Sequence, residues 1–464
     1  MTSNASNLDF IFHPRSVALV GITLSNPAHW TRVYLDCFLK YQFQGPVYPV
    51  NPKGGEVKGL KVYRNLEDIP GDVDYVISTV PAQAAPSLME ASARKGVKGI
   101  NFCTSGFSET GEEEGIRLEK ELVRLSKETS IRIIGPNSMG IYCPESRLSF
   151  DTEFPEEGGP VAFLSQSGGN VNNIVRQAKW RGVRFSKVIS YGNACDLNEC
   201  DFLEYLAHDR DTQIVALYIE GVEDGDRFRE ALTEVAKEKH VVILKGGKTA
   251  GGVRAVEGHT SSMAGSEVIW DSLSRQLKII QVHSLADLTD VLVTLQFMRR
   301  PQGKNACLLG IGGGSSVLIT DAFEKSGFHV PQLTQTLIRK IREYTPPAGN
   351  ILHNPLDCGN FDGLDKVVRT IKFISEWKEI DFFVGFQRMS VSPTDHMPQI
   401  MQMTESLIEA SQSVSKPMAA VAELIITPSF HEEVFPVIQK YVDARIPIYY
   451  SFSGAAHAMG LCFT

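Results

Sequence analysis

The segment SVALVGITLSN, residues 16–26, decides the fold, because a short apolar strand in it runs directly into a turn of small and hydroxyl-bearing residues. Two later segments repeat the pattern, PVAFLSQSGGN at residues 160–170 and NACLLGIGGGSS at residues 305–316. In α/β folds such a strand–turn–helix unit commonly holds the phosphates of a ligand. The three copies, spaced by about 145 residues, predict three consecutive α/β domains.

Runs rich in Val and Ile follow each opening segment and alternate with amphipathic stretches, which is typical of parallel sheets flanked by helices. Two stretches, around residues 142–159 and 298–305, interrupt this alternation and are the expected linkers. The sequence therefore predicts an α/β protein divided into three parts at these two places.

The composition is that of an ordinary soluble globular protein, with 43% hydrophobic and 22% charged residues in a chain of 464 residues. A formal net charge of −8 and the lack of basic runs argue against nucleic acid or an anionic membrane as the main partner. No apolar run approaches the roughly 20 residues of a membrane-spanning helix, and the first residues lack the pattern of a secretory signal. The eight cysteines are scattered, as expected of reduced thiols in a cytoplasmic protein.

Three glycine-rich stretches resemble known motifs but lack a residue that each motif requires. KGGKTAGG has Val242 where a P-loop needs its first glycine, and GIGGGSS has Ser315 in place of the third glycine of a dinucleotide-binding fingerprint. GGGSSV has Val317 in place of the last glycine of a nucleophile elbow, and neither H-E-x-x-H nor C-x-x-C occurs. These observations argue against P-loop kinases, simple hydrolases and metalloproteases.

One long segment, GGKTAGGVRAVEGHTSSMAG at residues 246–265, shows no periodic pattern and contains six glycines. Strand-to-helix connections usually have about 2–6 residues, and longer structureless loops inside compact domains tend to be functional. The segment leads into a predicted helix, SEVIWDSLSRQLK, for which Ser266 is the expected N-cap. A glycine-rich loop that presents one histidine, His259, suits a residue that must move between partners.

A neutral imidazole is a good nucleophile near pH 7 and can accept a phosphoryl group. It then needs an acceptor for its other ring N–H and backbone N–H groups for the phosphate oxygens. Glu220, at the carboxyl end of the predicted strand IVALYIEGV, is the candidate acceptor, and SQSGGN, residues 165–170, is the candidate anion site because it ends a strand and opens a helix. From the residues alone, a solvated turn carboxylate and a plain tight turn are equally good interpretations of these two features.

The segment LKGGKTAGGVRAVEGHTSSMAGS, residues 244–266, resembles the phosphohistidine loop of the NDP-forming acyl-CoA synthetases, relatives of succinyl-CoA synthetase. FSKVISYGN, ALYIEGV, SQSGG and NPLD also match the family, as do VYPVNPK, SGFSETGEEEG and GPNSMG nearer the N-terminus. The resemblance implies a Rossmann-like CoA-binding domain over residues 1–145 and two flavodoxin-like domains over residues 155–298 and 304–464. It also implies an alpha subunit whose nucleotide-binding ATP-grasp domain lies on a separate beta subunit.

Carried over position by position, the resemblance makes His259 the phosphorylated residue and Glu220 its carboxylate partner. It implies a turn that binds the phosphoryl group, made of Ser165, Gln166, Ser167, Gly168 and Gly169. It implies CoA contacts from turns of the first domain, with Asn137 near the thiol end: Gly21, Ile22, Thr23, Leu24, Ser25, Asn26, Asn51, Lys53, Val80, Pro81, Ser105, Gly106, Phe107 and Asn137. No metal ligand is expected among these residues, and ATP or ADP with Mg²⁺ would bind the partner subunit.

The resemblance implies a reversible relay in three steps. Phosphate attacks acyl-CoA to give an acyl phosphate and CoA, His259 takes the phosphoryl group and releases the acid, and the loop passes that group to a nucleoside diphosphate. We expect a hetero-oligomer, with or without an alpha–alpha contact, that acts on a small carboxylic acid. The identity of the acid and the choice between ADP and GDP stay open.

Two other functions stay open at this stage. The family more often has Gly-Ala-Ser in the first turn and glycine after His-Thr, where this chain has GITLSNPAHW and Ser261. A CoA-binding or regulatory protein of the same fold without turnover is therefore one alternative. An NAD(P)-dependent oxidoreductase that uses the first domain is another, although that domain lacks G-x-G-x-x-G and a matching acidic residue.

Overall fold

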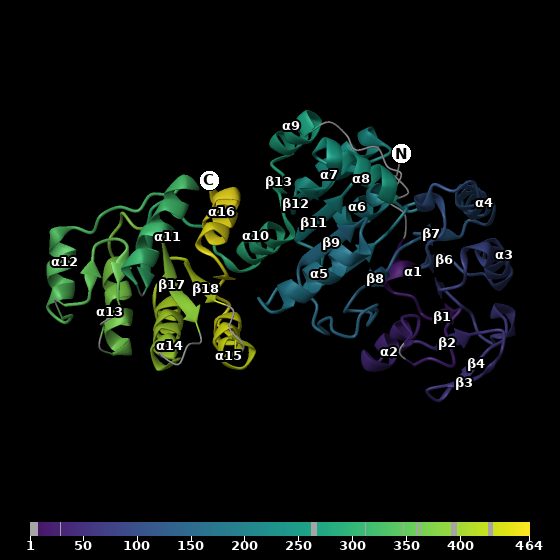
Figure 1. Cartoon of the computed structure of the whole chain (residues 1–464), viewed down its shortest axis with the longest axis horizontal. Helices are drawn as coiled ribbons and strands as arrows, with labels where there is room; N and C mark the ends of the chain where they lie inside the picture. The colour runs from purple at the N-terminus through teal and green to yellow at the C-terminus, as the bar shows by residue number, and fades with distance from the viewer. Residues whose placement is uncertain are drawn as a thin grey trace. The chain divides into compact units, whose positions relative to one another are not determined.

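The computed structural model of the chain (Figure 1) contains three extended, mostly parallel sheets within its described residues, which confirms the predicted α/β class. The chain groups into two compact units, Met1–Lys179 with Arg184–Leu285 and Trp180–Val183 with Ala286–Thr464. In the part of the chain that the structure describes, no helix is both long and apolar enough to cross a membrane. The structure describes residues 8–27, 29–260, 267–310, 312–346, 348–358, 361, 363–390, 397–425 and 430–464.

The first sheet of the first unit is parallel and runs in the order β2-β1-β5-β6-β7. Its strands are β1 (Val17–Val20), β2 (Val47–Val50), β5 (Tyr75–Ser78), β6 (Gly99–Phe102) and β7 (Arg132–Ile134). Its helices are α1 (Asp9–Phe12), α2 (Arg32–Lys40), η1 (Leu66–Asp68), η2 (Ala82–Ala84), α3 (Ala85–Lys95), η3 (Ser108–Thr110) and α4 (Glu113–Thr129). A separate antiparallel hairpin consists of β3 (Gly55–Val57) and β4 (Leu60–Val62). The strands β1 and β5 are buried throughout, which explains their unbroken apolar sequences.

The second sheet of this unit runs in the order β13-β12-β11-β9-β10-β8. Its strands are β8 (Gly140–Tyr142), β9 (Val161–Ser165), β10 (Phe185–Ser190), β11 (Ile214–Ile219), β12 (His240–Lys245) and β13 (Ile280–Val282). Its helices are α5 (Gly168–Lys179), α6 (Glu199–His208), α7 (Gly225–Ala236), α8 (Ala250–Thr260) and α9 (Glu267–Leu277). All neighbouring strands are parallel except β8, which pairs antiparallel with β10.

The strand β8 connects the two sheets of the first unit, because it follows the first sheet in the chain and hydrogen-bonds to the second. Beside it, Gly192 approaches the GPNSMG segment so closely that a Cβ atom would lie 2.2 Å from the carbonyl oxygen of Pro136 and 2.4 Å from that of Asn137. Gly192 also has a φ of +54°, which disfavours any other residue. The predicted boundaries at residues 145, 155, 298 and 304 remain predictions.

The second unit contains a sheet in the order β15-β16-β14-β17-β18-β19, in which only β15 runs antiparallel to its neighbour among the described strands. Its strands are β14 (Ala306–Gly310), β15 (Ile351–Leu352), β16 (Leu356–Asp357), β17 (Phe382–Ser390), β18 (Met418–Ile425) and β19 (Ile448–Tyr449). Its helices are α11 (Gly313–Lys325), α12 (Gln335–Arg342), α13 (Leu364–Ser375), α14 (Met397–Ser413), α15 (Phe430–Asp443) and α16 (Phe452–Phe463), preceded by α10 (Leu285–Phe297).

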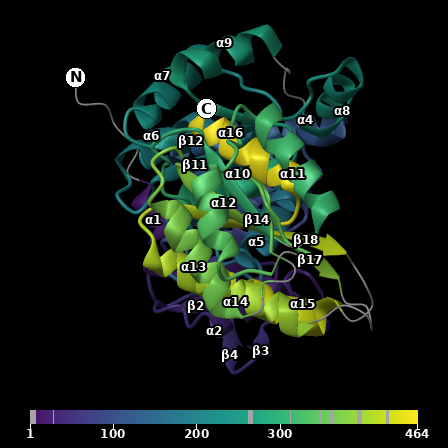
Figure 2. The same cartoon turned by 90° about the vertical axis from the view of Figure 1, so that its left-hand side faces the viewer.

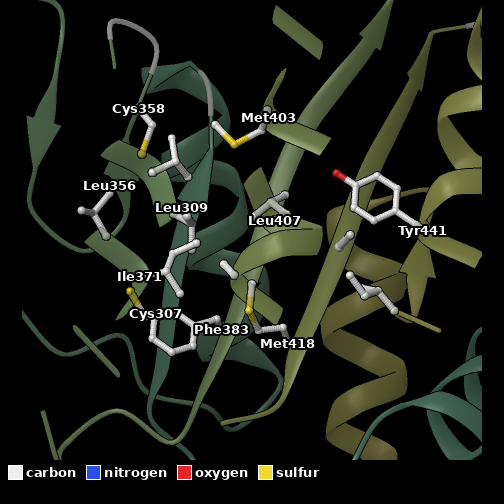
Figure 3. Close-up of a cluster of buried hydrophobic side chains, with 14 of the residues drawn as sticks. Cys307, Leu309, Leu356, Cys358, Ile371, Phe383, Met403, Leu407, Met418 and Tyr441 are labelled. Carbon is white, nitrogen blue, oxygen red and sulfur yellow. The ribbon is translucent and has the colours of Figure 1, made fainter. Parts of the chain in front are cut away.

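The core of this second unit lies between the sheet and the helices α13, α14 and α15, of which α13 and α14 lie side by side (Figure 2). Figure 3 shows Leu309 and Phe383 of the central strands facing Ile371 of α13 and Leu407 of α14. These side chains are at most 2% exposed, so apolar contacts with the helices exclude water from this face of the sheet.

The expected structureless loop over residues 246–265 is wrong in part, because residues 250–260 form the helix α8. The hydroxyl oxygen of Thr249 accepts a hydrogen bond from the amide of Gly252 and so acts as an N-cap. Val256, on the same helix, is buried. A cap and a buried anchor thus overcome the poor helix propensity of the glycines, which had hidden the helix in the sequence.

The close approach at Gly192 gives a stability prediction. We expect Gly192→Ala to lower the free energy of unfolding by at least ~2 kcal/mol, because the added methyl group meets two backbone carbonyls and the residue must keep a positive φ. Gly225→Ala is the matched control, since a Cβ there meets nothing within 4 Å and alanine favours the helix α7. Urea unfolding of both variants checks this, and equal stabilities would contradict it.

Candidate functional site

The carboxyl edge of the second sheet carries the residues that the sequence predicts for phosphoryl transfer. Ser165 is the last residue of β9, Glu220 directly follows β11, and Lys245 is the last residue of β12. These strands are parallel neighbours, so their carboxyl ends meet at one edge. The structure therefore brings the predicted phosphoryl-binding turn and Glu220 together.

The turn at residues 165–169 is shaped by its own serines. The hydroxyl of Ser165 donates to the carbonyl oxygen of Ser167 at 2.8 Å, and the amide of Ser167 donates back to that hydroxyl at 3.1 Å. The helix α5 begins immediately afterwards, at Gly168, so its N-terminal amides and dipole favour an anion here. A Cβ atom on Gly168 would lie 2.6 Å from Cγ of Met139, so glycine lets the GPNSMG segment approach this turn.

Glu220 is buried, at 4% exposure, and its backbone is held from two neighbouring strands. The side-chain oxygen of Gln166 accepts hydrogen bonds from the amides of Glu220, at 2.5 Å, and Gly221, at 3.2 Å. The ammonium of Lys245 donates to the Glu220 carbonyl oxygen at 2.8 Å. Burial lowers the pKa of Lys245, and the Glu220 carboxylate opposes this shift. Sequence reasoning missed Lys245, which looks like an ordinary strand end.

His259 lies on the helix α8, but its side chain is outside the described residues, as are Ser261 and Ser266. Its pairing with Glu220 therefore stays a prediction, and so does the N-cap of α9. The helix α8 itself packs against η3 of the first sheet. The backbone that bears the histidine thus lies against the SGFSET segment to which the sequence assigns CoA contacts.

The predicted CoA residues Gly21, Ile22, Asn51 and Val80 meet at the carboxyl edge of the first sheet. Gly21 has a φ of +92°, and a Cβ atom there would lie 2.9 Å from the backbone nitrogen of Val80. The side-chain amide of Asn51 donates to the carbonyl oxygen of Ile22 at 2.9 Å and accepts from the amide of Lys53 at 3.0 Å. The remaining residues of these turns lie beside them, exposed or partly exposed: Thr23, Leu24, Ser25, Asn26 and Pro81.

A buried arginine stands next to the first turn and was missed by sequence reasoning. Arg32, in the first turn of α2, is 5% exposed, and its guanidinium donates to the carbonyl oxygen of Thr23 at 3.4 Å. The amide of Thr23 in turn donates to the hydroxyl of Thr31 at 3.2 Å. The nitrogen Nε of Arg32 has no hydrogen-bond partner among the described atoms. The sequence signal that points to it is a basic residue at the start of the helix that follows the strand–turn unit.

The turn Ser105–Gly106–Phe107 holds a carboxylate of its own. The amide of Gly106 donates to Glu109 at 2.6 Å, and the amide of Phe107 donates to both Glu109 oxygens at 3.2 Å. Two amides that the sequence assigns to CoA are therefore bonded to an internal anion. Only Ser105 of this turn is exposed.

Asn137 is joined to the same turn through Asn193, which follows β10. The amide of Asn137 donates to the carbonyl oxygen of Thr104 at 3.0 Å, and its side chain donates to Asn193 at 3.4 Å. The side-chain nitrogen of Asn193 also donates to Glu109 at 2.6 Å and to Glu119 at 2.8 Å. The two sheets of the first unit are thus connected by polar groups at the predicted thiol end of the site. Sequence reasoning missed Asn193, Glu109 and Glu119.

Glu199, the first residue of α6, is a buried carboxyl group at the same edge of the sheet, with 3% exposure. Burial is the main cause that raises its pKa to about 7, and the neighbouring carboxylates of Glu223 and Asp201 contribute to this rise. The site therefore includes a carboxyl group that titrates near neutral pH.

Comparison with models of known protein families identifies the class of protein to which the chain belongs. A model of the CoA binding domain matches residues 15–144, and a model of the succinyl-CoA ligase like flavodoxin domain matches residues 158–295. The fold and these matches define a CoA-ligase type of α/β protein.

Individual relatives narrow the class. The chain is 34% identical to the alpha subunit of ADP-forming acetate–CoA ligase II of Pyrococcus furiosus, over 89% of each chain. It is 36% identical to the ADP-forming acetate–CoA ligase of Methanocaldococcus jannaschii over 75% of this chain, but spans only 49% of that longer protein. The solved structure of dinucleotide-forming acetyl-coenzyme A synthetase 1 of Ca. Korarchaeum cryptofilum, with phosphate and ADP, superimposes with a TM-score of 0.81 at 29% identity, over 98% of this chain and 96% of that one. The chain belongs to the family of ADP-forming acetate–CoA ligase alpha subunits.

Glu199 gives a pH-dependent prediction. Because folding raises its pKa from 4.5 to about 7, its contribution to stability is complete below pH 4.5 and is lost as the pH rises through 7. Glu199→Gln cannot ionise. We therefore expect its unfolding free energy, relative to that of the wild type, to rise by about 2 kcal/mol from pH 5 to pH 8.

Urea unfolding at the two pH values measures this gain. The control Glu230→Gln replaces a carboxylate that is 74% exposed and is expected to show no such change. A difference between Glu199→Gln and the wild type that is the same at both pH values would contradict the prediction.

Proposed function

We propose that this chain is the alpha subunit of a reversible NDP-forming acyl-CoA synthetase, which interconverts acyl-CoA, phosphate and ADP with a carboxylic acid, CoA and ATP. The observation that carries the proposal is the edge of the second sheet, where the turn 165–169 opens a helix beside the buried Glu220. Membership in the acetate–CoA ligase family supports the same reaction.

In the first step, an oxygen of inorganic phosphate attacks the thioester carbonyl carbon, the C–S bond breaks, and CoA leaves as its thiol. The product is an acyl phosphate. In the proposed arrangement, the turns around Gly21 and Asn51 hold CoA, Asn137 lies near the thioester, and the N-terminus of α5 stabilises the phosphate charge through its amides.

In the second step, the neutral imidazole of His259 attacks the phosphorus atom, the P–O bond to the acyl group breaks, and the carboxylic acid is released. Glu220 accepts a hydrogen bond from the other ring nitrogen, which fixes the tautomer and stabilises the positive charge that develops on the ring. In the third step, the phosphohistidine transfers its phosphoryl group to a nucleoside diphosphate, and the imidazole is regenerated.

The nucleotide, with Mg²⁺, is proposed to bind an ATP-grasp beta subunit. Two relatives from Pyrococcus furiosus are named as alpha subunits, whereas this chain spans 57% and 49% of the longer relatives from Archaeoglobus fulgidus and Methanocaldococcus jannaschii. That some relatives are separate alpha subunits and others are longer single chains supports a partner chain that supplies the part found only in the longer relatives. The names of these relatives make acetate and ADP the first acid and nucleotide to test.

The proposal predicts covalent labelling at His259. With acetyl-CoA and radiolabelled phosphate, the wild-type chain is expected to acquire acid-labile phosphate, and His259→Ala to lose at least roughly 10³-fold of the labelling rate because the nucleophile is gone. His208→Ala, which removes an exposed histidine at the end of α6, is the control and should label normally.

Two outcomes would contradict the proposal. Labelling of His259→Ala at the wild-type rate would show that another residue carries the phosphoryl group. A wild-type chain that binds acyl-CoA but is never labelled, alone or with its partner subunit, would favour the CoA-binding or regulatory alternative.

A further inference from the structure

The carboxylate of Glu220 accepts a hydrogen bond from Tyr218, a residue of the strand β11 that Glu220 directly follows. Because side chains two residues apart on a strand share a face, Tyr218 and Glu220 point to the same side at the end of β11. The phenol hydroxyl donates to Oε1 of Glu220 at 3.0 Å. Gln166 and Lys245 hold the backbone of Glu220, whereas Tyr218 binds the carboxylate itself.

The phenol also reaches the turn on the neighbouring strand. Asn170, which lies in the first turn of α5, is close enough to the Tyr218 phenol to lower its pKa. Burial raises the pKa of Tyr218, and the Glu220 carboxylate raises it further, so the phenol keeps its proton at neutral pH and remains a donor. Tyr218 thus binds the proposed partner of the histidine and lies beside the turn proposed to hold phosphate, because it pairs with Ser165 in the sheet.

Gly246, the residue after β12, leaves the space that this contact needs. A Cβ atom there would lie 3.0 Å from the Tyr218 hydroxyl and 3.5 Å from Cγ of Glu220. The amide of Gly246 donates to the carbonyl oxygen of Ile219 at 2.8 Å, so its backbone is fixed beside the pair. Close approach is therefore the physical reason for glycine at this position.

From this geometry we infer that Tyr218 is a positioning residue for phosphoryl transfer, which sets the orientation of the Glu220 carboxylate towards the imidazole of His259. The inference rests on the proposed function and adds a residue to it. The phenol acts through Glu220 and takes no part in bond making. A carboxylate held by a donor on its own strand is presented to the imidazole in one orientation, which preserves the alignment that phosphoryl transfer requires.

Tyr218→Phe tests the inference, because it removes the hydroxyl and leaves the ring. In the complex with its nucleotide-binding partner, we expect a fall of about 10-fold or more in kcat and in the rate of His259 labelling, with the KM for CoA changed by less than about 2-fold. Gly246→Ala, which crowds the same hydroxyl without deleting either group, should lower kcat in the same direction.

Tyr205→Phe is the matched control, because the Tyr205 hydroxyl donates to the Asp9 carboxylate at 2.9 Å, on the helices α6 and α1. It removes the same atom from the same kind of pair and should leave kcat unchanged. In a Glu220→Gln background, adding Tyr218→Phe should cause little further loss if the phenol acts through the carboxylate.

The outcomes separate the inference from the function. If the wild type is labelled at His259 and Tyr218→Phe is labelled at the same rate, the positioning role is overturned while the proposed function stands. Fully additive losses in the double variant would also overturn it. If the wild type is never labelled, the proposed function fails, and the inference fails with it.

Discussion

One side-chain amide, that of Gln166, joins the two halves of the candidate phosphoryl site. It accepts from the amides that follow β11 and donates to the Gly221 carbonyl oxygen at 3.3 Å, so the turn after one strand is fixed to the turn after its neighbour. The ladder itself sets this meeting, because Ser165 pairs with Tyr218 in the parallel register. A shift of one residue would turn Tyr218 and Glu220 to the other face of the sheet.

Two carboxylates, those of Glu109 and Glu119, accept hydrogen bonds beside the candidate CoA site. Glu109 binds two amides of the SGF turn, and Asn193 of the second sheet stands between Glu109 and Glu119. The helix that carries His259 packs against η3, which directly follows this turn. The loop to which the sequence assigns CoA contacts is therefore shaped by internal hydrogen bonds, and the helix α8 lies next to it.

The sequence predicts the sheets and their turns because strand periods and small turn residues are local signals. The opening segment at residues 16–26 and its two repeats become β1, β9 and β14, each followed by a turn and a helix. The helix α8 was not predictable in this way, since its glycines argue against a helix and its support comes from Thr249 and from burial of Val256. Glu109 looks like part of a solvated acidic run, and only the folded loop turns it back onto the amides before it. Tyr218 is visible in the sequence merely as a strand residue, and its role requires knowledge of where its hydroxyl points.

The strand β8 has a consequence for how the first unit can be divided. It precedes the linker around residues 142–159, yet its hydrogen bonds are to β10 of the second sheet. A polypeptide that starts after this linker would contain β10 without β8, and a strand that is buried along its length would become an open sheet edge able to pair with another copy. Residues 140–142 therefore complete the edge of the second sheet, and a boundary drawn at this linker would separate two hydrogen-bonded strands of one folding module.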